Sequence, residues 1–443
     1  MKQTRLLVDR LTPDDDLFVR MDLVLDLPVA NQFVWRLPAR VDPETLRALA
    51  RRLKRGRLSR LVVRQPSPCR DVWAHTESAG DFEFDDVPIG SGEATEWARR
   101  QADADLDILG GPAWRLSAGY SVDGTTTYVS LVNSHAVGDG GAMIAAVVEA
   151  VRDERFERAP GKVGMIDNMR DAAISLVAAG GAVKRLLHGS SPSMSATTGA
   201  QDPRTTGASA STVDTAEPSP TVMMLVPAGE FRQTAEETGG TLNSLFAAIM
   251  VGLVERTGRV KSGQVVPVNL PVSLRTARDR RANATAAARA FITLEETRYT
   301  DLSAVRQACK DAYVQLSPRS GHVAQLTILG QALNDFTFGK LAANAQTPLC
   351  LASNVGQVPD EFASLGTGIS AFVAARAITT TSDPRLLAAR QGGLSGWLSL
   401  AGGMATLSVT SLDPARVPDS TMLSTLLADE LARWGLTAHS WES

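Results

Sequence analysis

The sequence predicts a mixed α/β protein built in two halves, on three observations. Strand-like and helix-like segments alternate along the chain, which favours α/β architecture over separate all-α and all-β domains. The 443 residues are too many for one ordinary hydrophobic core. Residues 189–220 are dominated by Ser, Thr, Ala, Gly and Pro and bury too little to fold. We expect an N-terminal subdomain over 1–188, a flexible linker over 189–220 and a C-terminal subdomain over 221–443.

In the first half, the elements are predicted from hydrophobic periodicity. Residues 17–27 alternate polar and apolar side chains, which favours a strand. The later elements expected are a helix over 42–54, short strands over 61–64 and 72–75, a hairpin with strands over 114–122 and 125–132, and a helix over 142–156. The hairpin turns at Asp123-Gly124, a strong turn pair.

The second half repeats the alternation of strands and helices. Strands are expected over 221–226, 265–272, 348–355, 368–375, 393–398 and 404–411, and helices over 242–256, 302–316 and 420–434. A charge-free apolar stretch over 172–183 is too short to span a bilayer, which needs roughly 20 residues. It could lie against a lipid or another helix, but a helix of the protein core is the favoured interpretation.

The composition limits the functional classes. Hydrophobic residues make up 44% of the chain, charged residues 21%, and the formal net charge is -3, as in a folded globular protein. This balance gives no electrostatic reason to bind nucleic acid or anionic membranes, and no peripheral membrane contact is indicated. Cys69, Cys309 and Cys350 are widely spaced and suggest neither a disulfide framework nor a zinc site. With no secretory signal visible, a cytoplasmic location is expected.

The most informative motif is Ser134-His135-Ala136-Val137-Gly138-Asp139-Gly140. It follows the second hairpin strand and precedes a helix, so His135 is expected at a strand-to-helix junction. Imidazole has an ordinary pKa of roughly 6.5 and can accept a proton from a hydroxyl or amine near neutral pH. Asp139 could orient the ring or fix the turn. Equally, His135 could be an ordinary hydrogen-bonded histidine and Asp139 a simple helix cap.

Other cofactor chemistry finds little support. His75, His188, His322 and His439 have no neighbouring motif, and no pair has metal-ligand spacing on one element. The sequence contains neither a phosphate-binding loop nor a convincing dinucleotide fingerprint. We therefore expect no metal and no cofactor.

Several segments, in order, resemble the CoA-dependent acyltransferase superfamily, whose members include condensation domains. The resemblance is strongest to the bacterial wax ester synthase/diacylglycerol acyltransferase and polyketide-associated acyltransferase branches. The matching segments are Gly111-Pro112-Ala113-Trp114, Ser134 to Gly140, Thr241-Leu242-Asn243-Ser244, Val266 to Arg275 and Ser353-Asn354-Val355-Gly356. They resemble the family's Pro-Trp strand, H-H-x-x-x-D-G motif, Thr-x-Asn-Asp helix start, Pro-Val-Ser-x-Arg strand and Ser-Asn-Val segment.

The resemblance implies two chloramphenicol-acetyltransferase-like subdomains, each a mixed sheet covered by helices, that form a V with a tunnel at their interface. His135 would be the general base for acyl transfer from a thioester to a hydroxyl or amine. Asp139, Gly140 and Arg275 would support the site, with Asp139 paired to Arg275. The residues implied at the substrate are Ser273, Asn354 and Asn243. The donor would be acyl-CoA or an acyl carrier protein.

Two departures from the family pattern leave alternatives open. Ser134 replaces the first motif histidine, and Ser244 replaces the aspartate after Asn243. The same fold could therefore use His135 for thioester hydrolysis or a proton-transfer rearrangement. It could also serve as a non-catalytic binding or scaffold protein.

Overall fold

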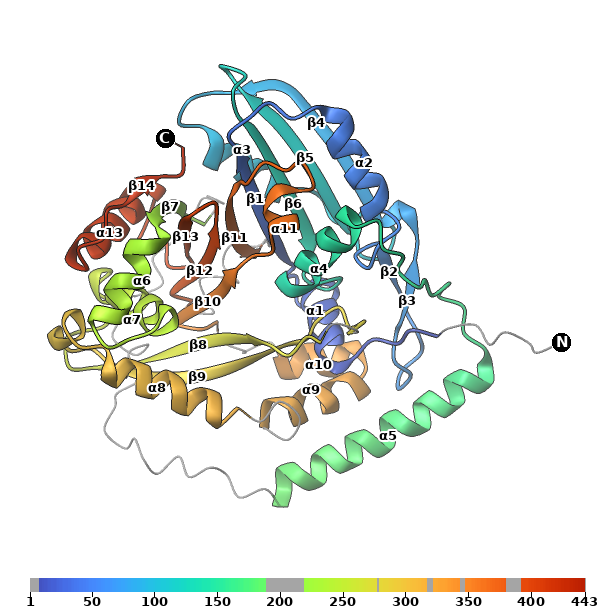
Figure 1. Cartoon of the computed structure of the whole chain (residues 1–443). Helices are drawn as coiled ribbons and strands as arrows, with labels where there is room; N and C mark the ends of the chain where they lie inside the picture. Colours follow the sequence, from blue (N-terminus) through green and yellow to red (C-terminus); the bar gives the residue numbers. More distant parts are fainter. Residues whose placement is uncertain are drawn as a thin grey trace.

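The computed structural model describes residues 8–188, 219–276, 279–316, 322–342, 347–379 and 392–442. Two mixed sheets with helices packed on them form two lobes (Figure 1). The mixed α/β architecture predicted from the sequence is confirmed. The predicted linker falls almost entirely outside the described residues and stays a prediction.

The first sheet has the strand order β11-β1-β6-β5-β4, in which only β4 and β5 are parallel neighbours. Its strands are β1 (Val29–Leu37), β4 (Gly80–Ile89), β5 (Trp114–Ser121), β6 (Thr127–Ser134) and β11 (Phe372–Thr379). The other elements of this half are α1 (Pro13–Leu23), α2 (Pro43–Leu53), β2 (Arg60–Val63), β3 (Val72–His75), η1 (Glu77–Ala79), α3 (Ala94–Ala102), α4 (Gly140–Val151) and α5 (Met165–His188).

One strand crosses between the halves of the chain. β11 comes from the C-terminal half but pairs along β1, from Val29 opposite Thr379 to Arg36 opposite Phe372. The sheet of the N-terminal lobe is therefore completed by a segment beyond residue 221. The predicted subdomains divide the chain by residue number. The two sheets do not follow that division, because β11 of the C-terminal half belongs to the first sheet.

The second sheet has the order β14-β7-β13-β12-β10-β8-β9, with β10 parallel to both β12 and β8. Its strands are β7 (Thr221–Pro227), β8 (Val265–Ser273), β9 (Thr285–Thr293), β10 (Cys350–Gln357), β12 (Leu394–Ala401), β13 (Met404–Ser411) and β14 (His439–Ser440). The helical elements are α6 (Ala228–Glu237), α7 (Leu242–Arg256), η4 (Glu296–Tyr299), α8 (Ser303–Val314), α9 (His322–Ala332), α10 (Asp335–Ala342), α11 (Asp360–Ser364) and α13 (Ser420–Arg433).

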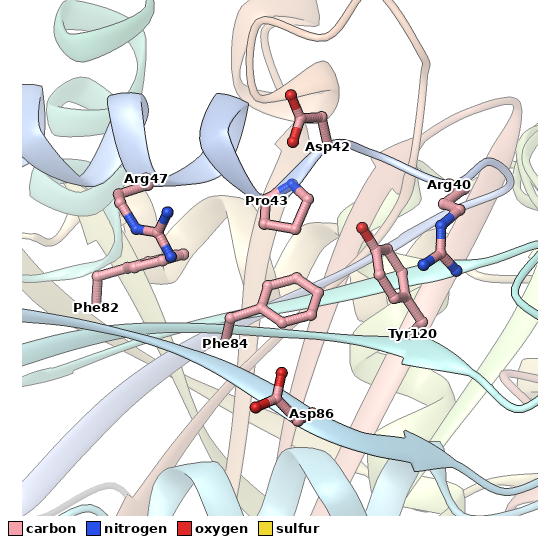
Figure 2. Close-up of a pocket in the computed structure, with 8 residues that line it drawn as sticks. All are labelled: Arg40, Asp42, Pro43, Arg47, Phe82, Phe84, Asp86 and Tyr120. Carbon is pink, nitrogen blue, oxygen red and sulfur yellow. The ribbon is translucent and has the colours of Figure 1, made fainter.

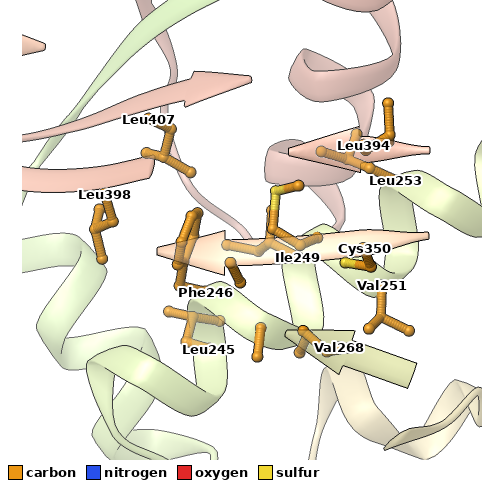
Figure 3. Close-up of a cluster of buried hydrophobic side chains, with 14 of the residues drawn as sticks. Leu245, Phe246, Ile249, Val251, Leu253, Val268, Cys350, Leu394, Leu398 and Leu407 are labelled. Carbon is orange, nitrogen blue, oxygen red and sulfur yellow. The ribbon is translucent and has the colours of Figure 1, made fainter. Parts of the chain in front are cut away.

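Helix α7 is the centre of the second lobe. It is apolar on all sides and buried from Ser244 to Val254, as expected of a helix enclosed by protein. Phe246 and Ile249 point toward the strands that carry Leu398 and Leu407 (Figure 3). The predicted helix over 242–256 is confirmed, with Thr241 as its N-cap.

Two sequence predictions are wrong. Residues 17–27, expected as a strand, lie mostly in α1, because Thr12 and Asp15 form a capping box and Pro13 starts the helix. The apolar stretch over 172–183, expected as a core helix, lies in α5, where its large side chains are exposed. The inward face of α5 carries mainly small and polar residues instead.

Among the described helices, no single one is long and apolar enough to cross a membrane. Only α6 and α7 taken together reach that length and composition, and they are bent by 90° at the break between them.

Candidate active site

His135 lies directly after β6, where the chain turns into α4. Its backbone N–H donates to the carbonyl of Val29 over 2.7 Å, which fixes the end of the strand against β1. Asp139 is the N-cap of α4 and accepts from the N–H of Ala142 over 2.7 Å. The strand-to-helix junction expected from the motif is present.

The imidazole of His135 is held by two residues that the sequence did not identify. The ring stacks on Phe18, with centroids 3.7 Å apart and planes 9° from parallel. Its Nδ1 lies 2.9 Å from Oδ1 of Asn283. The Nδ2 of Asn283 donates to the carbonyls of His135 and Ala136, over 3.1 and 3.3 Å, so Oδ1 is the atom that faces the ring. An amide oxygen only accepts, so Nδ1 carries the proton and Nε2 is the basic nitrogen.

Burial sets the charge of this ring. It lowers the pKa of His135 below its ordinary value of 6.5, against the opposing effects of the Asp139 carboxylate and the bond to Asn283. A histidine with a lowered pKa is neutral at physiological pH. His135 therefore has both the tautomer and the charge that a general base requires.

Asn283 is positioned in turn by Asp15 of α1. The backbone N–H and the Nδ2 of Asn283 donate to Oδ1 of Asp15, over 2.7 and 3.3 Å. Burial raises the pKa of Asp15, and Arg60 and the N–H groups of Thr12 and Asn283 oppose that shift. Asp15 and Phe18 are three residues apart on one face of α1, so this helix supports both sides of the site.

Asp139 supports the site rather than facing it. Its carboxylate pairs with Arg275 over 2.8 Å and also accepts from the N–H of Ala284 and the hydroxyl of Thr285. Burial alone would raise the pKa of Asp139, but the Arg275 guanidinium and the N–H groups of Ala284 and Ala142 hold it below 3.8. The ion pair that the resemblance implied between Asp139 and Arg275 is thus present.

The motif glycines have different roles. A Cβ on Gly138 would lie 2.8 Å from Cδ2 of Leu58, so a larger residue at this turn would force the Leu58 side chain to move. A Cβ on Gly140 would meet only Phe33 at an ordinary 3.9 Å. Of the two positions, Gly138 leaves less room for a side chain, and the supporting role of Gly140 stays a prediction.

The two serines that depart from the family pattern are both buried. Ser134 ends β6, and its hydroxyl accepts from the N–H of Ala136 over 3.3 Å. Ser244 completes the cap of α7, where its hydroxyl accepts from the N–H of Thr241 over 2.7 Å. Each makes a local bond that stabilises the backbone.

The three residues expected at the substrate border one pocket. Asn243, Ser273 and Asn354 line a cavity of about 320 Å³ together with Phe246, Leu270, Pro271, Val272, Tyr313 and Ala352. The amide of Asn354 donates to Asn243, and Asn243 donates to the Tyr313 hydroxyl over 3.1 Å. Every lining residue is uncharged. Ser273 also lies beside the start of α4, since a Cβ on Gly141 would be 3.5 Å from its Oγ.

A larger hollow of about 810 Å³ lies elsewhere, between α2, β4 and β5 (Figure 2). Phe84 and Tyr120 meet there edge to face at 4.9 Å, and Arg40 stacks on Tyr120 at 3.7 Å. None of the residues that line it is among those described above around His135.

Protein-family models and the sequences of curated proteins give no match to this chain. Solved structures do. The first condensation domain of the CDA synthetase has a TM-score of 0.58 at 15% identity, covering 98% of this chain and 99% of that one. The condensation domain of the Monacolin K polyketide synthase MokA has a TM-score of 0.56 at 13% identity, and the match covers 97% of each chain. The wax ester synthase/diacylglycerol acyltransferase of Marinobacter aquaeolei VT8 has a TM-score of 0.54 at 13% identity, and the match covers 96% of this chain and 98% of that one.

These similarities extend over the full length of the chain. The protein has the fold of condensation domains and of that wax ester synthase/diacylglycerol acyltransferase, as the sequence motifs predicted. At 13–15% identity the likeness establishes the fold alone.

Proposed function

We propose that this protein transfers an acyl group from a thioester donor, on CoA or a carrier protein, to a hydroxyl or amine acceptor. The observation that carries the proposal is the bond from Nδ1 of His135 to Asn283, which leaves Nε2 as a neutral base. The fold is shared with condensation domains and a wax ester synthase/diacylglycerol acyltransferase, which agrees with acyl transfer.

In the proposed reaction, Nε2 of His135 takes the proton from the acceptor as its oxygen or nitrogen bonds to the thioester carbonyl carbon. The tetrahedral intermediate then collapses, the C–S bond breaks, and the thiolate takes the proton back from the imidazolium. General base catalysis of this kind contributes on the order of 100- to 10,000-fold. The remainder comes from holding donor and acceptor together.

The uncharged pocket at Asn243, Ser273 and Asn354 suits a neutral part of a substrate, since it would cost free energy to bury a charge there. Its volume of about 320 Å³ fits a small group rather than a whole CoA. We assign it to the acyl group or the body of the acceptor, with Ser273 nearest the motif.

The test is mass spectrometry of products from purified protein given a panel of acyl-CoAs with alcohol and amine acceptors. We expect an acylated product that His135→Ala abolishes while the protein stays folded. His439→Ala, at an exposed histidine on β14, should leave turnover unchanged.

Other outcomes separate the alternatives. Free acid released without any acceptor would identify thioester hydrolysis. Product formation that persists in His135→Ala would remove His135 from the chemistry. A functional effect that needs the fold but not His135 would indicate a scaffold.

A further inference from the structure

The pocket at Ser273 combines an apolar lining with a short chain of hydrogen-bonded polar side chains. These are Asn354 of β10, Asn243 at the start of α7 and Tyr313 near the end of α8. The rest of the lining is apolar and consists of Phe246, Leu270, Pro271, Val272 and Ala352. A ligand in this pocket would therefore lie mostly against hydrocarbon and meet polar atoms at only a few points.

One backbone bond fixes the orientation of the Asn354 amide. The pairing of β10 with β12 shifts register between Asn354 and Gly356, where a bulge brings Gly356 to a φ of 76°. The N–H of Gly356 donates to Oδ1 of Asn354 over 2.8 Å. Because an N–H cannot donate to an amide NH2 group, Nδ2 of Asn354 must be the atom that faces Asn243.

The orientation of Asn354 in turn fixes those of Asn243 and Tyr313. Nδ2 of Asn354 donates to Oδ1 of Asn243, so Nδ2 of Asn243 faces the Tyr313 hydroxyl and donates to it over 3.1 Å. The Tyr313 oxygen is therefore the acceptor in this bond, and its own hydrogen is not used. Among the residues that the structure describes, none accepts that hydrogen.

The Tyr313 hydroxyl keeps its hydrogen at neutral pH. Burial raises the pKa of Tyr313 above its ordinary value of 10.0, Cys309 adds to this shift, and the bond from Asn243 opposes it. Tyr313 is thus a hydrogen-bond donor without a protein acceptor at the edge of an otherwise apolar pocket.

The other unused hydrogens around the pocket have the same character. Asn243 and Asn354 each have two amide hydrogens and use one of them in the chain of bonds. The Ser273 hydroxyl accepts from the N–H of Arg275 over 3.3 Å, which leaves its hydrogen available. The amide oxygens of Asn243 and Asn354, by contrast, already accept hydrogen bonds. The pocket thus offers donors to a ligand.

We propose that this pocket selects a neutral, mostly apolar group that carries one oxygen acceptor, as a hydroxyl, carbonyl or ether, and that the Tyr313 hydroxyl donates to that oxygen. The inference rests on the proposed acyl transfer, because it describes part of a substrate of that reaction. A plain hydrocarbon chain would fill the same space but would exclude water from the Tyr313 hydroxyl without replacing its hydrogen bond, which costs free energy.

The test compares probes of matched shape that differ by an oxygen in place of a carbon. The acyl pair is 3-hydroxybutanoyl-CoA and 3-methylbutanoyl-CoA, and the acceptor pair is 2-propoxyethanol and 1-hexanol. Isothermal titration calorimetry of the His135→Ala protein measures their affinities without turnover. We expect the probe with the additional oxygen to bind about three- to tenfold more tightly in one of the pairs. The pair that shows the preference identifies whether the acyl group or the acceptor occupies the pocket.

Tyr313→Phe removes only the hydroxyl, so it should abolish the preference without weakening the binding of the hydrocarbon probe. The matched control is Tyr120→Phe, because the Tyr120 hydroxyl donates to the carbonyl of Val41 over 2.7 Å and lies outside this pocket. This control should retain the preference. Equal affinities within both pairs overturn the inference. So does a preference that survives Tyr313→Phe, or failure of all four probes to bind.

The calorimetry and the product assay can fail separately. A preference that depends on Tyr313, with no acylated product from any donor, would support the selectivity of the pocket and contradict acyl transfer. Acylated product that depends on His135, with no preference for oxygen, would support acyl transfer and contradict the selectivity of the pocket.

Discussion

At the scale of single residues, the site depends on how His135 is held. The sequence identified the histidine and its aspartate, because the motif is contiguous and follows a readable hairpin. It did not identify Asn283, Asp15 or Phe18, which lie far away in the chain and carry no local motif. Such contacts are defined only when the chain folds, so no spacing in the sequence could have revealed them.

Asn283 is a positioning residue for the base. Asn283→Ala removes the acceptor for Nδ1 of His135, and we expect kcat to fall on the order of 10- to 100-fold through loss of orientation, with KM little changed. The bond to Asn283 also raises the pKa of His135, so the acid limb of the pH profile should move to lower pH. Steady-state kinetics over a range of pH measures both. A variant that loses stability alone, with an unmoved limb, would contradict this role.

The pH dependence of turnover follows from burial of His135. A base must be deprotonated, and an ordinary histidine would lose half its activity at pH 6.5. Because burial lowers the pKa of His135, kcat/KM should be above half of its plateau value at pH 6.5 and reach the half-maximal point only at a lower pH. A half-maximal point at or above 6.5 would be inconsistent with His135 as the buried base.

At the scale of elements, Arg275 and residues 282–285 hold the start of α4 through Asp139. The sequence motifs indicated Arg275 but gave no signal for the residues that follow it. Arg275 pairs with Asp139 and also donates to the carbonyls of Arg281 and Ala282. These residues lie between β8 and β9, so they join the second sheet to the His135 motif that follows β6 of the first sheet.

Removing one partner of the ion pair between Arg275 and Asp139 should strongly destabilise the folded protein. Both side chains are buried, so Arg275→Met leaves a buried carboxylate without its partner, and we expect a loss of about 3 to 5 kcal/mol in unfolding free energy. Chemical denaturation measures this loss. Arg433→Met breaks an exposed pair with Glu296 and should cost about 0 to 1 kcal/mol. Equal losses of unfolding free energy in the two variants would contradict the prediction that the buried pair contributes more than the exposed one.

Helix α1 shows why periodicity alone misled the prediction. Its apolar residues follow no clear helical stripe, and its inward face includes Asp15, Asp16 and Arg20. The start signal was present, since Thr12, Pro13 and Asp15 form an N-cap, a first-turn proline and a capping box. A helix that buries charged side chains departs from the usual amphipathic pattern.

At the scale of the whole molecule, the sequence predicted the two-lobed mixed α/β fold but not how the lobes are joined. Strands with strong local patterns were found, as in the hairpin of β5 and β6. β1 was missed because it is buried almost throughout and does not alternate, and β9 because it is rich in alanine. The pairing of β1 with β11 is a contact across most of the chain, which local sequence does not encode.

The two lobes should unfold together. The Ser399 hydroxyl of β12 donates to the carbonyl of Val373 in β11 over 2.5 Å, and one hydrophobic cluster joins Met223 of β7 to Trp97 and Ala374. Scanning calorimetry should therefore show one transition. Two well-separated transitions would show that the shared strand and core do not couple the lobes.

Because β11 belongs to the sheet of the other half, the chain should not tolerate being made as two separate pieces. If the gene were cut within the codons for residues 189–220, the upstream product would lack β11, and the edge of β1 would be open from Val29 to Arg36. An open edge of unpaired N–H and C=O groups invites aggregation. The downstream product would carry the missing strand with nothing to pair with. The two pieces should therefore be recovered in native form only when made together, as halves that complement each other.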